Sequence, residues 1–188
     1  MSWLDALFGR TKLKKANIDP LFAITTAAVD LEEHDIRFGK RAYVGIRPME
    51  SSGFSALMQN IDQMLDLLSK DHDLRFSQSH DDLNFNWFIL QAALTEDLVT
   101  AAHLVGDTLQ ENGFDGQLLA SVFQLLIGSH ACFLVYNYKR GAFYPFCQTG
   151  PQLRDNSQEL RLETLLKPHL PIEPDHSRWY ALWDLPEK

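Results

Sequence analysis

The clearest pattern of apolar and polar positions lies in residues 51–70. Apolar side chains recur there every three or four positions, with polar side chains opposite, and the apolar set is Phe54, Leu57, Met58, Ile61, Leu65 and Leu68. This 3.6-residue period predicts an amphipathic helix that packs on a sheet. The preceding stretch RAYVGIRP, residues 41–48, alternates and stops at Pro48, which is typical of a strand that leads into the helix.

Two alternating stretches that follow predict an antiparallel hairpin. DLRFSQS, residues 73–79, and LNFNWFILQ, residues 83–91, flank a turn-like HDD. In the second stretch every other side chain is apolar and points to one face, while Asn84 and Asn86 point to the other.

The next two elements complete a recognisable order. A helix is predicted with Thr95 at its N-cap and a stop at Asn112–Gly113. Residues 117–127, QLLASVFQLLI, are interpreted as a central strand, although periodicity alone does not distinguish such a run from a buried helix. The order β-α-β-β-α-β predicts the α+β class: a two-layer sandwich with an antiparallel or mixed sheet and a ferredoxin-like core.

The last third of the chain predicts an added hairpin and a C-terminal helix. Residues 131–147 form two β-rich arms around Lys139-Arg140-Gly141, and Pro145 indicates that the returning arm is an edge strand. In residues 155–167, Asn156 and Glu159 have capping-box spacing, which predicts a helix. The aromatic tail WYALW, residues 179–183, is expected to dock on the domain.

Composition narrows the class of protein. The chain is 45% hydrophobic and 11% aromatic, which indicates a folded domain, and its net charge is −8. Nucleic acid binding needs a basic face, so this acidic balance argues against it. No apolar run approaches the roughly 18 to 20 residues that span a bilayer, and no signal peptide is evident, so we expect a cytoplasmic protein.

The two cysteines cannot form a disulfide framework. Cys132 and Cys147 are expected to be reduced core thiols, because the cytosol opposes disulfides. A redox bridge between them across the predicted hairpin is the alternative.

Histidines and carboxylates crowd the stretch DHDLRFSQSHDD: Asp71, His72, His80, Asp81 and Asp82. A metal needs three or four converging ligands, and a solvated turn explains the same residues more simply. No nucleophile elbow, Walker A loop or dinucleotide fingerprint is present. We therefore predict no catalytic residue, metal or cofactor, and keep a small metal-dependent enzyme built on His72 and His80 as an alternative.

The hairpin tip and the tail supply candidate contacts for a protein partner. The tip pairs adjacent cations with aromatic neighbours, a composition suited to binding hot spots. The predicted partner-binding residues are Lys139, Arg140, Phe143, Tyr144, Arg178 and Trp179. The alternative is that the aromatic residues alternate into the core and the cations only solubilise the turn.

Residues 1–17 are predicted to form an amphipathic basic segment, and residues 18–188 a single α+β domain. The segment groups an apolar face before a cationic flank: Trp3, Leu4, Leu7 and Phe8, then Arg10 and Lys12. Three interpretations stay open, namely packing on its own domain, weak contact with an anionic membrane surface, and docking into a partner's groove.

Three stretches resemble the PspA-associated family called PspAB: LDALFGRTKL near the start, YKRGAFYPF in the late hairpin and PIEPDHSRWYALW near the end. The resemblance implies a role beside PspA, a helical membrane-repair scaffold, in the response to envelope stress, and it implies no reaction. It favours a non-enzymatic cytoplasmic adaptor or regulator that binds a PspA-type helical protein at or near the inner membrane face. A chaperone-like binder of a partner helix is the alternative, and a homodimer stays open.

Overall fold

The computed structural model describes residues 19–81, 84–128, 130–183 and 185–186. A short 3-10 turn, Asp19–Phe22, precedes the first helix. The helices are α2 (Ala23–Glu32), α3 (Ser52–Asp71), α4 (Thr95–Glu111) and α5 (Asn156–Leu166), and the strands are β1 (Arg37–Ile46), β2 (Leu74–His80), β3 (Asn86–Ala92), β4 (Leu118–Ile127), β5 (His130–Asn137), β6 (Ala142–Gly150) and β7 (Leu153–Arg154).

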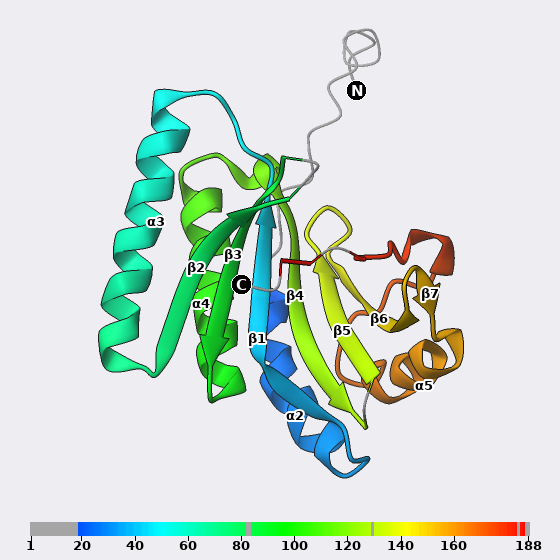
Figure 1. Cartoon of the computed structure of the whole chain (residues 1–188). Coiled ribbons are helices and arrows are strands. Elements are labelled where there is room, and N and C mark those ends of the chain that lie inside the picture. The colour runs from blue at the N-terminus through cyan, green and yellow to red at the C-terminus, as the bar shows by residue number, and fades with distance from the viewer. Residues whose placement is uncertain (1–18, 82–83, 129, 184, 187–188) are drawn as a thin grey trace, which may run out of the picture.

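The strands form one seven-stranded sheet with the order β2-β3-β1-β4-β5-β6-β7, in which all neighbours are antiparallel (Figure 1). The predicted α+β class is confirmed. Of residues 117–127, whose pattern left strand and helix open, Leu118–Ile127 form the central strand β4, and Gln117 ends the 3-10 turn before it.

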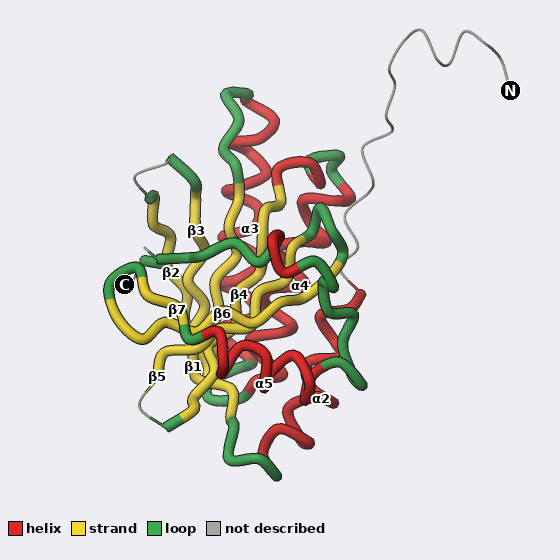
Figure 2. Tube along the Cα trace, turned by 90° about the vertical axis from the view of Figure 1, so that its right-hand side faces the viewer, coloured by secondary structure: helices red, strands yellow, loops and turns green. Residues whose placement is uncertain are grey.

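Helices cover one face of the sheet and build the larger core (Figure 2). The apolar stripe of α3 packs as predicted: Phe54, Leu57, Ile61 and Leu65 are buried. Each such side chain contributes about 1.5–3 kcal/mol relative to exposure. Ser51 caps this helix, because its hydroxyl accepts the Phe54 N–H at 3.1 Å.

The opposite face of the sheet carries a second core beneath the C-terminal tail. Paired residues form an apolar row across five strands: Ile89, Tyr43, Val122, Val135 and Tyr144. Trp179 and Trp183 of the tail pack against this cluster. The tail therefore docks as predicted and closes the second face.

Some local predictions need correction. β1 begins at Arg37 rather than Arg41, and α2 was not predicted at all. Thr95 is the first residue of α4 and not its N-cap. The N-cap position is occupied by Leu94, which is extended and supplies no side-chain cap. Helix α5 is capped by Asp155, whose carboxylate accepts the Gln158 N–H at 2.9 Å, and not by Asn156.

The predicted hairpin is β5 and β6, and Gly141 takes the positive φ of 67° that its turn requires. The prediction that the returning arm is an edge strand is wrong, because the short strand β7 follows β6 in the sheet. β7 pairs only with Gln148 and Gly150, so the outer side of β6 around Pro145 has no neighbouring strand: Phe143 forms hydrogen bonds with the tail, and Cys147 with Asp155 and Glu159. A missing N–H costs no ladder bond at such an edge.

Cys132 and Cys147 face each other across this hairpin and form a disulfide, with their Cα atoms 4.2 Å apart. The expectation of two reduced thiols is wrong for this structure, and the alternative bridge is the one observed. Both side chains are fully buried.

Candidate protein-binding surface

The late hairpin β5–β6 and the C-terminal tail, a name used here for residues 171–183, are joined by backbone hydrogen bonds. The Phe143 N–H donates to the Pro171 carbonyl at 2.8 Å, and the Glu173 N–H donates to the Phe143 carbonyl at 2.8 Å. Ile172 thus pairs with Phe143 as a parallel bridge. This pairing places Arg140, at the hairpin tip, beside the charged residues of the tail.

Glu173 organises the cations at this junction. Its side chain is nearly inaccessible, with the residue 3% exposed. One carboxylate oxygen accepts the Arg140 Nε–H at 2.8 Å, and the other lies 4.0 Å from Arg178 Nη1. The hydrogen bond from Arg140 is the main cause that lowers the pKa of Glu173, so the carboxylate stays ionised and orients the guanidinium.

Asp175 extends the same network toward the surface. It accepts from the Ser177 hydroxyl at 2.6 Å and pairs with Arg178 Nε at 3.0 Å. The Ser177 hydrogen bond is the main cause that lowers the pKa of Asp175. Arg178 is therefore held by two carboxylates that are both ionised at neutral pH.

The exposed part of this junction combines cations with one aromatic ring. The side chains of Arg140 and Arg178 are 42% and 41% exposed, and Tyr180 is 57% exposed. Lys139 is exposed at the tip. We call Lys139, Arg140, Arg178 and Tyr180 the hairpin–tail surface; arginine and tyrosine are the residue types enriched in binding hot spots.

Three predicted contact residues serve the fold instead. Phe143 packs in the helix-side core, while Tyr144 and Trp179 stack in the tail-side core with ring centroids 6.4 Å apart. The Trp179 indole N–H donates to the Glu173 carbonyl at 2.9 Å. The prediction that these aromatic side chains are exposed contacts is wrong, because both faces of β6 are covered.

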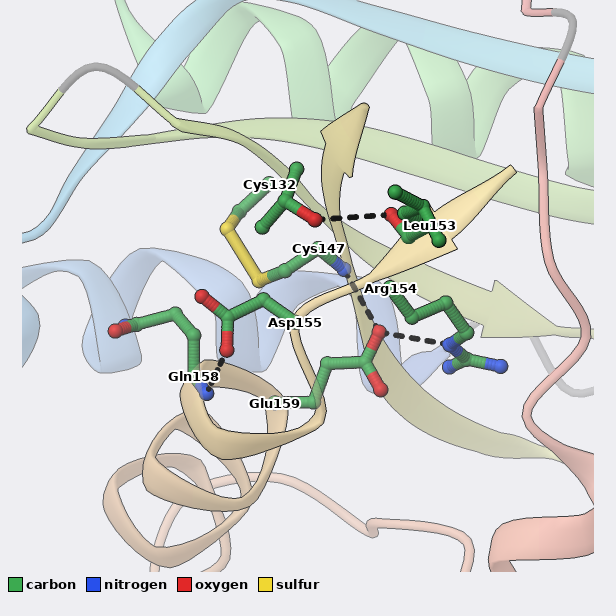
Figure 3. Close-up of a disulfide and its surroundings, with 8 residues drawn as sticks. Cys132, Cys147, Leu153, Arg154, Asp155, Gln158 and Glu159 are labelled. Atoms are coloured by element: carbon green, nitrogen blue, oxygen red, sulfur yellow. Dashed lines mark hydrogen bonds and ion pairs between the residues drawn. A yellow bond between two sulfur atoms is a disulfide. The ribbon is translucent and has the colours of Figure 1, made fainter. Parts of the chain in front are cut away.

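A second buried glutamate, Glu159 of α5, links β6 to the tail through Arg154. Glu159 Oε1 accepts the Cys147 N–H and the Arg154 Nε–H, each at 2.9 Å (Figure 3). Arg154 in turn donates to the Trp179 carbonyl at 2.6 Å and lies over the Phe146 ring. Two buried glutamates, each paired with an arginine, therefore fix the tail on the sheet.

Sequence reasoning missed Glu159, Glu173 and Tyr180 as members of the site. The capping-box spacing predicts a capping role for Glu159, whereas its carboxylate accepts the Cys147 N–H of β6. The signal for Glu173 was its place between two prolines in PIEP, directly before the charged turn. The N-terminal candidates Trp3, Leu4, Leu7, Phe8, Arg10 and Lys12 lie outside the described residues.

Among the described residues, the predicted histidine and aspartate cluster is not assembled; Asp82 lies outside them. His72 lies before β2 and pairs with Asp97 at 2.7 Å, whereas His80 ends that strand. Because a strand rises about 3.3 Å per residue, the seven residues of β2 separate the two histidines by about 20 Å. Asp81 accepts the Phe85 backbone N–H and the Trp87 indole N–H. In the described part of the chain, no three histidine, cysteine, aspartate or glutamate side chains form a metal-type group.

The fold and this surface define a small α+β domain whose aromatic tail is fixed across the sheet and presents cations at one corner. The chain belongs to the family PspAB, PspA associated protein B, whose model matches residues 1–187. No curated protein and no solved structure shows significant similarity to it. Among the residues described above, no helix is long and apolar enough to cross a bilayer.

Proposed function

We propose that this protein is a non-enzymatic adaptor or regulator of a PspA-type envelope-stress system, and that the hairpin–tail surface contacts a helical protein partner. Family membership supports the association with PspA. A physical complex, a cytoplasmic location with peripheral contact at the inner membrane face, and a homodimer are further parts of this proposal.

The observation that carries the proposal is the preorganised pair Arg140 and Arg178. Binding normally costs side-chain entropy, about 0.5–1.5 kcal/mol for each long side chain that becomes fixed. Here Glu173 and Asp175 already fix both guanidinium groups, while more than a third of each side chain remains accessible. Tyr180 adds a rigid aromatic contact beside them. Such a surface suits acidic and apolar side chains on a partner helix.

The test is calorimetric titration of the full chain with a purified PspA-type protein. Lys139→Ser combined with Tyr180→Ser removes exposed contacts without leaving a buried charge unpaired. We expect affinity to fall about tenfold or more, as for a hot-spot pair, with an unchanged melting temperature. Lys167→Ser, an exposed lysine beyond α5, is the matched control. Unchanged affinity in the double variant removes this surface from the proposal.

The chaperone-like alternative requires an exposed apolar groove. The candidate groove is the second face of the sheet, which the tail fills with Trp179 and Trp183. The enzyme alternative loses its geometric basis with the separation of His72 from His80. Neither alternative has an observation that favours it over the adaptor.

We also infer that β1 to β4 form a ferredoxin-like unit. Helix α3 connects β1 to β2, helix α4 connects β3 to β4, and the strand order within the unit is β2-β3-β1-β4. The hairpin β5–β6 then extends the sheet from β4 and carries the proposed contact surface to the far end from β2.

A further inference from the structure

A basic hollow is lined by residues near the start of β2 and the end of β3. Figure 1 shows these two strand ends at the same end of the sheet. Its volume is about 350 Å³. The residues that line it are Lys40, Arg41, Asp73, Arg75, Gln91, Ala92 and Ala93. Three cations and one carboxylate give it a local charge of +2 in a chain whose net charge is −8.

The sheet register aligns the polar side chains of the hollow. Gln91 of β3 pairs with Arg75 of β2 on one side and with Arg41 of β1 on the other. Cross-strand neighbours lie about 5 Å apart and point to the same face, so Gln91 stands between Arg75 and Arg41 in one row across the sheet. Among the described residues, Lys40 and Arg75 make no ion pair, although Asp73 lines the same hollow.

We propose that this hollow binds a phosphate monoester, carried either by a small soluble molecule or by a lipid headgroup. Guanidinium groups bind phosphate oxygens through paired N–H donors, and an ammonium and an amide supply further donors. A phosphate of charge near −2 balances the local charge. The volume falls at the lower end of small-ligand sites, which fits a headgroup-sized ligand better than an acidic helix.

The test is a titration of the isotope-labelled full chain with inorganic phosphate and glycerol phosphate, followed by amide resonance shifts. Sodium chloride at equal ionic strength is the reference. We expect saturable shifts at Gln91, Ala92 and Ala93, and about tenfold weaker binding in Arg75→Gln, because one charge-assisted contact is lost. Lys167→Gln, with the same change of charge outside the hollow, should bind like the wild type.

A second arm identifies the source of the phosphate. Co-sedimentation with phosphatidic acid vesicles, reduced by Arg75→Gln and absent with phosphatidylcholine, assigns the ligand to a lipid headgroup. Saturable phosphate shifts without Arg75-dependent sedimentation assign it to a soluble ester. Shifts that chloride reproduces, with no Arg75-dependent sedimentation, overturn the proposal. So does a glutamate-rich peptide that binds more tightly than phosphate and loses affinity in Arg75→Gln.

This inference is independent of the adaptor proposal. The hollow belongs to β1, β2 and β3, whereas the hairpin–tail surface belongs to β5, β6 and the tail at the other end of the strand order. Arg75→Gln should therefore leave binding of a PspA-type protein unchanged, which separates failure of one proposal from failure of the other.

Discussion

At the scale of single residues, Glu173 decides how the hairpin–tail surface is held. We predict that Glu173→Gln lowers the free energy of unfolding by about 1.5–3 kcal/mol, the range for a hydrogen bond to a charged group. The neutral amide keeps the shape and loses the charge that holds Arg140. Urea denaturation measures the difference, and Glu50→Gln on an exposed loop is the control. Equal midpoints for Glu173→Gln and the wild type would remove the role given to this carboxylate.

The same carboxylates predict an acid dependence of stability. The folded-state pKa values of Glu173 and Asp175 lie below their ordinary values of 4.5 and 3.8, so the unfolded chain binds more protons in that window. Their contribution is present above the ordinary values and is lost as the pH falls through the lowered ones. As the pH is lowered through this window, the urea midpoint of unfolding should fall less in Glu173→Gln than in the wild type. Parallel curves would contradict this assignment.

At the scale of elements, the disulfide joins two strands that are already paired by hydrogen bonds. Cys132 and Cys147 are separated by 15 positions, and closing a loop of this size stabilises a protein by about 3 kcal/mol in the chain-entropy model. Reduction should lower the free energy of unfolding by about that amount. Alkylation of protein denatured without reductant tests the bond directly, because two modified thiols would show that it is absent.

The tail has almost no regular secondary structure, but packing and hydrogen bonds hold it on the sheet. Trp179 contacts the second core, donates to Glu173, and accepts from Arg154. We predict that Trp179→Ala costs about 3–5 kcal/mol, as for other buried aromatic residues, and increases binding of an apolar dye to the uncovered face. Trp179→Phe should recover most of the stability. A stable Trp179→Ala variant that binds no dye would show that the tail does not close this face.

Local sequence patterns predict some of the helices and strands and not others. Helix α3 and the β2–β3 and β5–β6 hairpins follow from local periodicity and turn residues, which act over a few positions. Helix α2 lacks such a local signal, because Phe22 at its N-cap supplies no side-chain hydrogen bond. The buried residues of this helix and of the 3-10 turn before it nevertheless have helical spacing: Leu21, Ile24, Ala27 and Leu31. The docking of the tail was predicted from its aromatic residues.

Which face a side chain occupies could not be predicted in the same way. Phe143 and Tyr144 alternate, so an exposed second face would have left Tyr144 accessible. The tail covers that face from about 35 positions further along the chain, and no local pattern encodes such a contact. For the same reason the cations of the surface could be named from the sequence, whereas the carboxylates of Glu173 and Asp175 that orient Arg140 and Arg178 could not.

At the scale of the whole molecule, the sheet separates the two surfaces for which we propose different binding partners. The hairpin–tail surface lies at the β5–β6 end, and the basic hollow lies at the β1–β3 end. A rigid, doubly covered sheet between them suits a platform that presents surfaces to partners. We propose that the first of these surfaces, the hairpin–tail surface, binds a PspA-type protein.

The most direct measurement is hydrogen exchange of the full chain with and without a purified PspA-type protein. We predict that binding protects residues 138–142 of the hairpin tip and residues 174–181 of the tail, and that Lys139→Ser with Tyr180→Ser removes this protection. Binding that leaves both segments unchanged and protects another part of the chain would contradict the account.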